Sequence, residues 1–438
     1  MQVYCVGGAV RDELLGLPVR DRDWVVVGAT PQLLQSRGFL PVGRDFPVFL
    51  HPDTREEYAL ARTERKSGPG YRGFVVEFSP DVTLEDDLKR RDLTINAMGL
   101  TSEGELLDPT GGAADLSGRV VAMTSEAAFR ADPIRPLRAV RFAAGLGFRL
   151  DPDTATVVRE VAAEQRAGSA RLPAPERVRD ELARLLFDRP AAALAHARDL
   201  GLLETFLPEL AACVGVNQGP LHHLDVFDHS VEALRVLVET FPDSGAALRL
   251  ATLLHDVGKA ATLARGPFGR PTFHGHDAVG AELTARALRR LRFDAHTVKT
   301  ASALVRRHML PLPQDDRAAR RFAHRYGDLL PDLLRLMIAD REAARGRAAG
   351  PGGRMRYRLA VSRVLAVLDE EPPPAPLLTG EDVMDLLGLD EGPLVGEALR
   401  LVAEARAVGD VRDREGAEDL LRRYAAANGW PTRGQLGA

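Results

Sequence analysis

The spacing of apolar residues divides the chain into two unlike parts. Up to about residue 124, short apolar runs alternate with glycine- and proline-rich turns, which is typical of the strands and short helices of an α/β fold. From about residue 125 onward, apolar positions recur with the period of an amphipathic helix, about 3.6 residues. Proline-rich breaks at residues 172–175 and 371–376 indicate boundaries within this helical part. The pattern therefore predicts an α+β protein: an N-terminal α/β head with a small mixed sheet, followed by an all-helical remainder.

The opening unit, VGGAVRDELLGLPVRDRDWVVV at residues 6–27, carries the first candidate chemistry. It predicts a strand, a Gly-Gly turn, a short helix, and a second strand that begins near Asp21 and Asp23. Side chains two apart on a strand point to the same side, so these carboxylates would lie together, and hard cations such as Mg²⁺ prefer carboxylate oxygens. Gly7 and Gly8 would expose backbone N–H groups at the start of the helix, where a phosphate binds well. Arg11, about one turn further, would add a charge-assisted contact.

GGAVRDELLG followed by DRDW resembles the signature of the class II tRNA nucleotidyltransferase and poly(A) polymerase family, within the polymerase-beta-like superfamily. The resemblance implies that Asp21 and Asp23 are catalytic and bind Mg²⁺, and that Gly8 and Arg11 bind a nucleoside triphosphate. A second block, EDDLKRRDLTINAM at residues 85–98, has the family's RRDxTINAM form. By that resemblance, Arg91 contacts the bound nucleotide.

A third block, ADPIRPLRAVRF, corresponds to the family's EDxxR motif, with alanine in place of its Glu. Asp132 and Arg135 match the motif, and Arg138 and Arg141 continue the arginines at steps of three. On a helix these steps drift by about 60° each, which long arginine side chains can bring to one ligand. A carboxylate only accepts hydrogen bonds and a guanidinium only donates them. Asp132 facing the amino group and Arg135 facing the ring nitrogen would thus accept cytosine and adenine and reject guanine and uracil.

Some features of the third block leave alternatives open. Asp132 precedes Pro133, so it is also suited to cap a helix that begins at the proline. Pro136 would remove a hydrogen bond from the first turn of such a helix. PERVRDE at residues 175–181 resembles the family's last block, and we expect it to brace the base-selecting helix.

A fourth set of motifs lies in the helical part: LHHLDVFDH, LHDVGK, HGHDAVG and MIADRE. Their order resembles that of the HD metal-dependent phosphohydrolases. By motif position the implied ligands are His229, His255, Asp256 and Asp340, with His276 as a further candidate. Imidazole and carboxylate together suit a borderline divalent metal, and we consider Ni²⁺, Mn²⁺, Co²⁺ and Mg²⁺. The alternative is an HD fold that serves only as a scaffold.

Composition excludes several other classes of protein. With 438 residues, 45% of them hydrophobic, the chain should form two to four domains. Its 2 cysteines form no zinc-site spacing and no disulfide framework, which fits a reducing cytosol. We find no signal peptide and no apolar run of membrane-spanning length, and expect a cytoplasmic protein. The net charge is −4, but the charges are unevenly distributed: residues 286–325 are arginine-rich and residues 381–419 are acidic.

The resemblance spans nearly the whole chain and implies a head at residues 1–124, a base-selecting neck at 125–210, an HD domain at 211–345 and a helical tail at 346–438. It implies template-independent addition of the 3′-terminal CCA from CTP and ATP to tRNA that lacks all or part of it. A second, metal-dependent phosphohydrolase activity, of the 2′,3′-cyclic phosphodiesterase, 2′-nucleotidase or phosphatase type, is expected in the HD domain. No membrane and no obligate protein partner is implied.

Other functions remain possible on the same motifs. Enzymes that add only two cytidines tend to have a shortened loop between the first two blocks; here residues 62–74 are full length, which favours addition of all three nucleotides. An enzyme that adds only A is a further alternative. A poly(A) polymerase usually has a basic C-terminal extension, whereas residues 381–419 are acidic. A non-catalytic RNA-binding protein would not need the Asp21/Asp23 pair.

Overall fold

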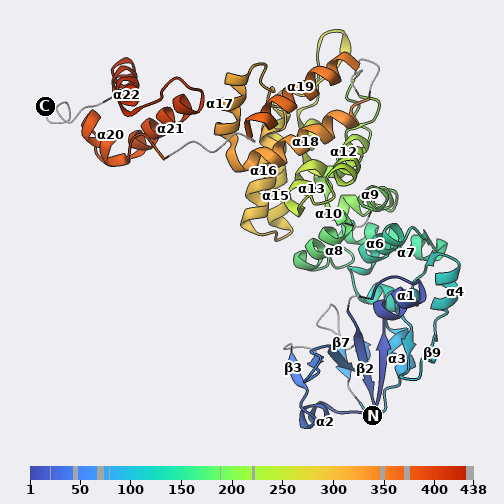
Figure 1. The fold of residues 1–438 in the computed structure, drawn as a ribbon. Helices are drawn as coiled ribbons and strands as arrows, with labels where there is room; N and C mark the ends of the chain where they lie inside the picture. The colour runs from blue at the N-terminus through green and yellow to red at the C-terminus, as the bar shows by residue number, and fades with distance from the viewer. Residues whose placement is uncertain are drawn as a thin grey trace.

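The computed structural model describes residues 1–19, 21–42, 48–66, 74–77, 79–187, 189–219, 222–345, 351–368 and 375–430. The chain runs along an elongated, bent molecule, with the sheet at the N-terminal end and helices α20, α21 and α22 at the C-terminal end (Figure 1). The predicted α/β head followed by helices is confirmed. No helix among the described residues is both long and apolar enough to cross a membrane.

The head contains most of the strands. Its elements are β1 (Gln2–Val6), α1 (Gly8–Leu14), β2 (Asp23–Val27), α2 (Pro31–Ser36), β3 (Leu40–Val42), β4 (Val48–Leu50), β5 (Glu57–Leu60), β6 (Thr63–Lys66), β7 (Phe74–Glu77), α3 (Leu84–Lys89), β8 (Gly99–Leu100), β9 (Leu106–Leu107), α4 (Gly112–Ser117) and β10 (Val120–Val121). The strand, short helix and second strand predicted for the opening unit correspond to β1, α1 and β2, to within a few residues. Part of the loop predicted at residues 62–74 forms strand β6, and residues 67–73 lie outside the described residues.

The main sheet has seven strands in the order β3-β4-β5-β2-β1-β8-β9. β2 and β5 are parallel and their other pairings are antiparallel, so the sheet is mixed, as predicted. The register places Asp23 opposite Val6, the last residue of β1, and beside Glu57, the first residue of β5. Asp23 and Glu57 therefore lie next to each other at the end of the sheet where β1 leads into α1.

Helices dominate the rest of the chain. They are α5 (Glu126–Ala131), α6 (Arg135–Leu146), α7 (Pro152–Ala167), α8 (Pro175–Phe187), α9 (Pro190–Asp199), α10 (Leu203–Phe206), α11 (Pro208–Ala211), α12 (Val226–Thr240), α13 (Ala246–Leu254), α14 (Gly258–Thr262), α15 (His276–Arg290), α16 (Ala295–Arg307), α17 (Asp316–Tyr326), α18 (Leu330–Ala343), α19 (Pro351–Leu368), α20 (Gly380–Leu387), α21 (Pro393–Ala407) and α22 (Arg414–Asn428). The short strands β11 (Arg149–Leu150), β12 (Ala264–Arg265) and β13 (Pro271–Thr272) interrupt them.

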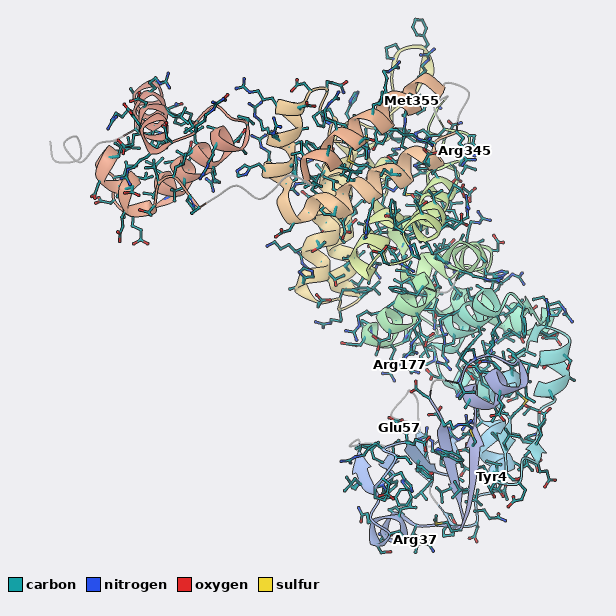
Figure 2. The ribbon with its side chains drawn as sticks, viewed as in Figure 1. Tyr4, Arg37, Glu57, Arg177, Arg345 and Met355 are labelled. Carbon is teal, nitrogen blue, oxygen red and sulfur yellow. The ribbon has the colours of Figure 1, made fainter. Side chains whose placement is uncertain are left out.

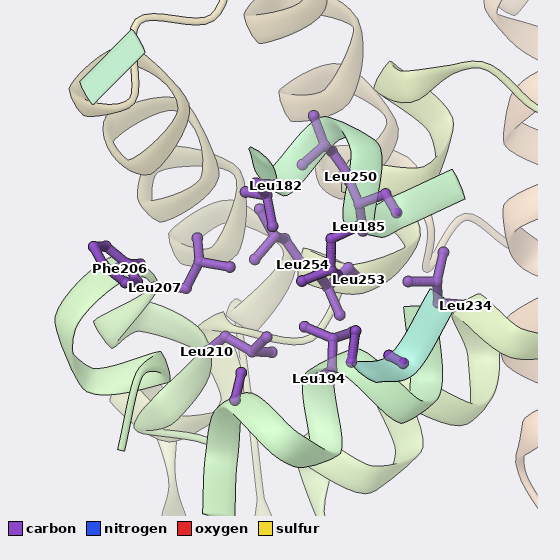
Figure 3. Packing of buried hydrophobic residues seen from close by; sticks show 14 of the residues in the cluster. Leu182, Leu185, Leu194, Phe206, Leu207, Leu210, Leu234, Leu250, Leu253 and Leu254 are labelled. Atoms are coloured by element: carbon purple, nitrogen blue, oxygen red, sulfur yellow. The ribbon is translucent and has the colours of Figure 1, made fainter. Parts of the chain in front are cut away.

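A continuous apolar core joins the helices of the neck to those that carry the HD motifs. Figure 3 shows its centre, where leucines of α8, α9, α12 and α13 meet the segment around α10. Buried Arg249 of α13 also links these segments through hydrogen bonds. Its guanidinium donates to the backbone oxygens of Leu186, Pro242 and Ser244 at 2.9 Å each. The neck and the helices of the HD motifs therefore pack as one unit.

The C-terminal helices α20, α21 and α22 have an apolar core of their own. Helix α19, by contrast, contributes Val361 and Val364 to the larger core. Where α17 faces α21, Arg321 and Arg325 both pair with Glu404, at 3.1 and 3.4 Å. Some arginines of the basic stretch thus contact the acidic tail of the same chain.

Candidate active site and metal centre

A cleft of about 720 Å³ lies between the sheet and the neck. It is lined by every residue predicted for the nucleotide site: Gly8, Arg11, Asp21, Asp23, Arg91, Asp132, Arg135, Arg138 and Arg141. Glu57 on the head and Arg177 on the neck lie on its two sides (Figure 2). Five separate stretches of sequence thus converge on one cavity.

The floor of the cleft carries three exposed carboxylates, those of Asp21, Asp23 and Glu57. Asp23 begins β2 and Glu57 begins the neighbouring strand β5, while Asp21 lies just before β2. This donor set consists of oxygen atoms alone, which fits a hard cation such as Mg²⁺. Glu57 was not predicted, because only the strand register brings it beside Asp23.

Gly7, the first residue of the Gly-Gly turn, has a structural role in place of the phosphate contact predicted for it. The N–H of Gly7 donates to the carbonyl of Met98 at 3.1 Å, so it is not available to a phosphate. Gly7 has φ +75°, and a Cβ there would lie 2.9 Å from Nη1 of Arg91. Glycine is required because a side chain would both strain the backbone and displace Arg91. Gly8, which begins α1, still lines the cleft.

Arg91 is positioned by a buried acid, Asp87, which sequence reasoning missed. The Asp87 carboxylate accepts from Arg90 at 2.5 Å, from Arg91 at 3.3 Å and from the backbone N–H of Arg62 at 3.3 Å. Burial would raise the pKa of Asp87, but Arg91 and Arg90 outweigh it and hold the pKa below its usual value. The ionised carboxylate therefore fixes two arginines of the second block at the cleft.

Three arginines surround one aromatic ring where head and neck meet. The guanidinium carbons of Arg11, Arg138 and Arg141 lie 5.0, 5.5 and 4.1 Å from the centroid of Phe142. Each is within reach of a cation–π attraction, which offsets part of the repulsion between like charges. Arg11 also donates to Oδ1 of Asn96 at 2.8 Å. The arrangement presents converging positive charge to the cleft and suits a polyphosphate.

Helix α8 braces this cluster from behind. Buried Glu181 accepts from Arg138 at 3.2 Å and from Arg141 at 2.6 Å, and Arg138 also donates to Asp92 at 2.7 Å. Burial opposes ionisation of Asp92, yet Arg138 and Arg135 lower its pKa. Glu181 belongs to the PERVRDE block, so that block contacts the arginine helix as expected.

Asp132 does not cap a helix that begins at Pro133. Helix α5 ends at Ala131 and α6 begins only at Arg135, which places Pro136 in the first turn, where no intrahelical donor is needed. The expected loss of a hydrogen bond at Pro136 is therefore wrong. The Asp132 carboxylate instead accepts from Arg177 at 2.8 and 2.7 Å, a bidentate pair.

Arg135 is buried at the back of the cleft. Its guanidinium donates to the backbone carbonyls of Arg91, at 3.3 Å, and Ala128. It thus links the second block to the third.

The HD motifs form a separate buried cluster on α12, α13, α15 and α18. Nε2 of His229 lies 2.9 Å from Oδ1 of Asp340, and Nε2 of His255 lies 3.2 Å from Oδ2 of Asp256 and 3.6 Å from Oδ1 of Asp340. Ligand atoms of His229, His255 and Asp340 all lie within 4.8 Å of one another. His276 does not join this group. It lies with Asp256 and His308, a histidine that sequence reasoning missed because it is outside the recognised motifs.

The electrostatics of the cluster favour a bound cation. Burial disfavours charge on His255, but Asp256 and Asp340 outweigh it and raise its pKa to about 10. Among the described residues, buried Nε2 of His255 and Oδ1 of Asp256 have no hydrogen-bond partner. Buried polar atoms without partners are costly, and a divalent metal would satisfy them. The residues present therefore fit the metal that the motifs imply.

Matches to known families divide the chain in the same order as the motifs. Residues 3–122 match the poly(A) polymerase head domain, residues 147–214 match a probable RNA- and SrmB-binding site of polymerase A, and residues 226–345 match the HD domain.

Relatives match over nearly the full length. The chain is 50% identical over 427 residues, 96% of its length and 95% of the relative's, to a protein of Deinococcus radiodurans named A-adding tRNA nucleotidyltransferase. A Methylococcus capsulatus protein named Multifunctional CCA protein is 42% identical over 94% of this chain and 93% of its own length. One from Paracidovorax citrulli with the same name is 51% identical over 70% of this chain and 73% of its own length.

Solved structures share the fold. The Bacillus stearothermophilus CCA-adding enzyme in complex with CTP covers 98% of this chain and 94% of its own, with a TM-score of 0.65 at 24% identity. The Thermotoga maritima CCA-adding enzyme complexed with tRNA covers 97% of this chain and 91% of its own, with a TM-score of 0.57 at 20% identity.

The pairing of Asp87 with two arginines predicts an acid-sensitive head. Asp87→Asn should lower the free energy of unfolding by about 3–5 kcal/mol near neutral pH, because it leaves two arginines without a buried counter-ion. Since the folded pKa of Asp87 lies below 3.8, the difference from wild type should be full above that pH and shrink as the pH falls further. Urea unfolding between about pH 3 and 7 measures this. Glu85→Gln on the exposed face of α3 is the control, and equal stability of Asp87→Asn and wild type near pH 7 would contradict the analysis.

Proposed function

The chain belongs to the family of A-adding and CCA-adding tRNA nucleotidyltransferases, and on that premise we propose that it adds the 3′-terminal C, C and A to tRNA from CTP and ATP without a nucleic-acid template. The observation that carries the proposal is the cleft between head and neck, which is lined by both carboxylates and arginines. That arrangement suits a metal-bound triphosphate. Because tRNA is the substrate, we expect the protein to act in the cytoplasm.

In this proposal Asp21 and Asp23 bind Mg²⁺, with Glu57 beside them. The ion, when bound, supplies Lewis acidity to the α-phosphate and to the attacking 3′-hydroxyl of tRNA. Arg11 and Arg91 hold the phosphates with charge-assisted hydrogen bonds. The helical remainder holds the acceptor end of tRNA by shape and backbone, the way double-stranded RNA is generally recognised.

Addition of A alone is the second candidate, favoured by the name of the Deinococcus radiodurans relative, which matches over 95% of its length. Against it stand the Multifunctional CCA proteins, whose identity to the chain is similar. The two candidates differ in which 3′ ends of tRNA they extend and in which nucleotide they add to each end.

Three tRNA substrates separate these functions: one without CCA, one ending in the first C and one ending in CC. With labelled CTP and ATP, full CCA addition extends all three to the mature end. An A-adding enzyme would extend only the substrate ending in CC, and a poly(A) polymerase would extend past the mature end.

The same assay tests the metal site. Asp21→Ala or Asp23→Ala should lower incorporation by roughly a thousandfold or more, because a lost metal contact removes several kcal/mol of transition-state stabilisation. Binding of tRNA should remain. Asp53→Ala, in an exposed turn of the head, is the matched control; wild-type incorporation by either active-site variant would overturn the assignment.

We further propose that Asp132 and Arg135 select the base. The Asp132 carboxylate accepts two hydrogen bonds from Arg177, which hold it at the cleft. An acceptor there suits the amino groups of cytosine and adenine and opposes the carbonyl groups of guanine and uracil.

Asp132→Ala should therefore raise GTP and UTP incorporation relative to CTP and ATP by about tenfold to a hundredfold, because each mismatched buried contact costs about 1–3 kcal/mol. Steady-state kinetics with all four nucleotides measures the ratio. Asp180→Ala, on the exposed face of α8, should leave it unchanged. Wild-type selectivity in Asp132→Ala would mean that Asp132 only orders the turn between α5 and α6.

For the HD domain we propose a metal-dependent phosphohydrolase that acts on small phosphate esters such as 2′,3′-cyclic nucleotides. The support is the buried cluster of imidazoles and carboxylates with unpaired polar atoms. Imidazole ligands favour a transition metal over Mg²⁺ at this site.

Asp256→Ala should abolish hydrolysis of 2′,3′-cyclic AMP in the presence of Ni²⁺, Mn²⁺ or Co²⁺, and leave nucleotide addition within about twofold, because the cluster shares no residue with the cleft. A colorimetric phosphate assay after phosphatase treatment measures hydrolysis. Glu282→Ala, exposed on α15, is the control. If the wild-type protein hydrolyses no phosphate ester with any of these metals, the HD domain is a scaffold.

A further inference from the structure

A second cavity, of about 580 Å³, lies between α12, α18 and α19. It shares no lining residue with the nucleotide cleft, and none of the candidate metal ligands of the HD helices lines it. Its lining includes the four arginines Arg235, Arg341, Arg345 and Arg358. Pockets of this size that gather a few polar groups are typical of small-molecule sites.

Two of the four arginines are paired with carboxylates of the protein. Arg235 lies 2.7 Å from Glu232 and 2.5 Å from Glu239, and Arg358 lies 3.1 Å from Glu342. Glu239 and Glu342 are the two carboxylates that line the pocket. The acids at the pocket are therefore already engaged by these two arginines.

The other two arginines, Arg341 and Arg345, pair with no carboxylate among the described residues. The guanidinium carbon of Arg341 lies 5.8 Å from the centroid of the Tyr357 ring, within reach of a cation–π attraction. Arg345, labelled in Figure 2 just beyond the end of α18, donates to the backbone carbonyl of Glu342 at 3.2 Å. A guanidinium has five N–H donors, so both residues keep donors for a ligand.

The start of α19 leaves room for the Arg341 guanidinium. A Cβ added at Gly353 would lie 3.0 Å from Nη2 of Arg341, so a larger residue at this position would crowd the arginine. Arg341 directly follows Asp340, and successive residues of a helix point about 100° apart. The arginine and the carboxylate of the HD motif therefore face different sides of α18.

The pocket also offers an apolar surface and a hydroxyl donor. Val236, Ile338 and Val361 line it, and Val236 and Val361 also belong to the large core, which holds this surface in place. Burial raises the pKa of Tyr357, and nearby Asp340 adds to the effect, so the phenol keeps its proton. A ligand with both an apolar part and an anionic group would match this lining.

We propose that this pocket binds a small phosphate monoester of about mononucleotide size, with Arg341 and Arg345 holding its phosphate group. A phosphate monoester carries about −1.5 to −2 charges near neutral pH, which matches two arginines without carboxylate partners. A carboxylate or a phosphodiester of an RNA backbone carries a single charge and matches them less well. Guanidinium groups bind phosphate oxygens through paired hydrogen bonds, which adds directional preference to the charge.

The test measures binding of radiolabelled AMP to the full-length chain by equilibrium dialysis. The chain carries Arg11→Ala and Arg91→Ala to weaken binding at the nucleotide cleft, and EDTA removes divalent metals. Adding Arg341→Met and Arg345→Met should weaken AMP binding by about tenfold or more, because charge-assisted hydrogen bonds are lost while the length of each side chain is kept. Arg356→Met, exposed on α19 and outside the pocket lining, is the matched control and should leave binding unchanged.

Competition experiments identify the group that is bound. Inorganic phosphate should displace AMP, whereas adenosine and a short RNA without terminal phosphates should not. Circular dichroism melting checks that each variant is folded. Absence of saturable AMP binding, or equal binding by the folded variant with both methionines, would overturn the proposal. Displacement of AMP by the unphosphorylated RNA would assign the pocket to an RNA backbone and would also overturn it.

Discussion

The nucleotide cleft depends on buried carboxylates that hold like-charged arginines close together. Arg90 and Arg91 share Asp87, and Arg138 and Arg141 share Glu181. Without these counter-ions the guanidinium groups would repel one another and move apart toward solvent. All four arginines line the cleft. The proposed phosphate site is therefore held in shape by the protein's own ion pairs, which lowers the cost of ordering side chains on binding.

These ion pairs also decide how the head meets the neck. Asp92 belongs to the head, Glu181 to α8, and Arg138 of α6 bonds to both. Arg11 on α1 reaches across to the ring of Phe142 on α6. The boundary between the sheet and the helices is thus a charged layer, whereas the boundary between the neck and the HD helices is a layer of leucines. The two candidate sites lie on opposite sides of that apolar layer and share no side chain.

Much of the fold and of the nucleotide site could be predicted because the deciding residues are neighbours in sequence. Asp21 and Asp23 are two residues apart, Arg135 and Arg138 are three apart, and all four line the cleft. Glu57, Arg177 and His308 could not be predicted, since each is brought to its site by a contact between distant segments. The prediction for Pro136 is wrong because α6 begins at Arg135 and not at Pro133, which makes Pro136 a favourable first-turn proline.

The ion pairs that join α17 to the tail affect how a polyanion could bind to the surface of α17. Arg317, Arg321 and Arg325 are about half exposed, and their partners are Asp410 and Glu404 of the tail. Exposed pairs of this kind are weak and are screened by salt. Any polyanion that binds this face of α17 must displace those carboxylates, so the acidic tail competes with it for the same guanidinium groups.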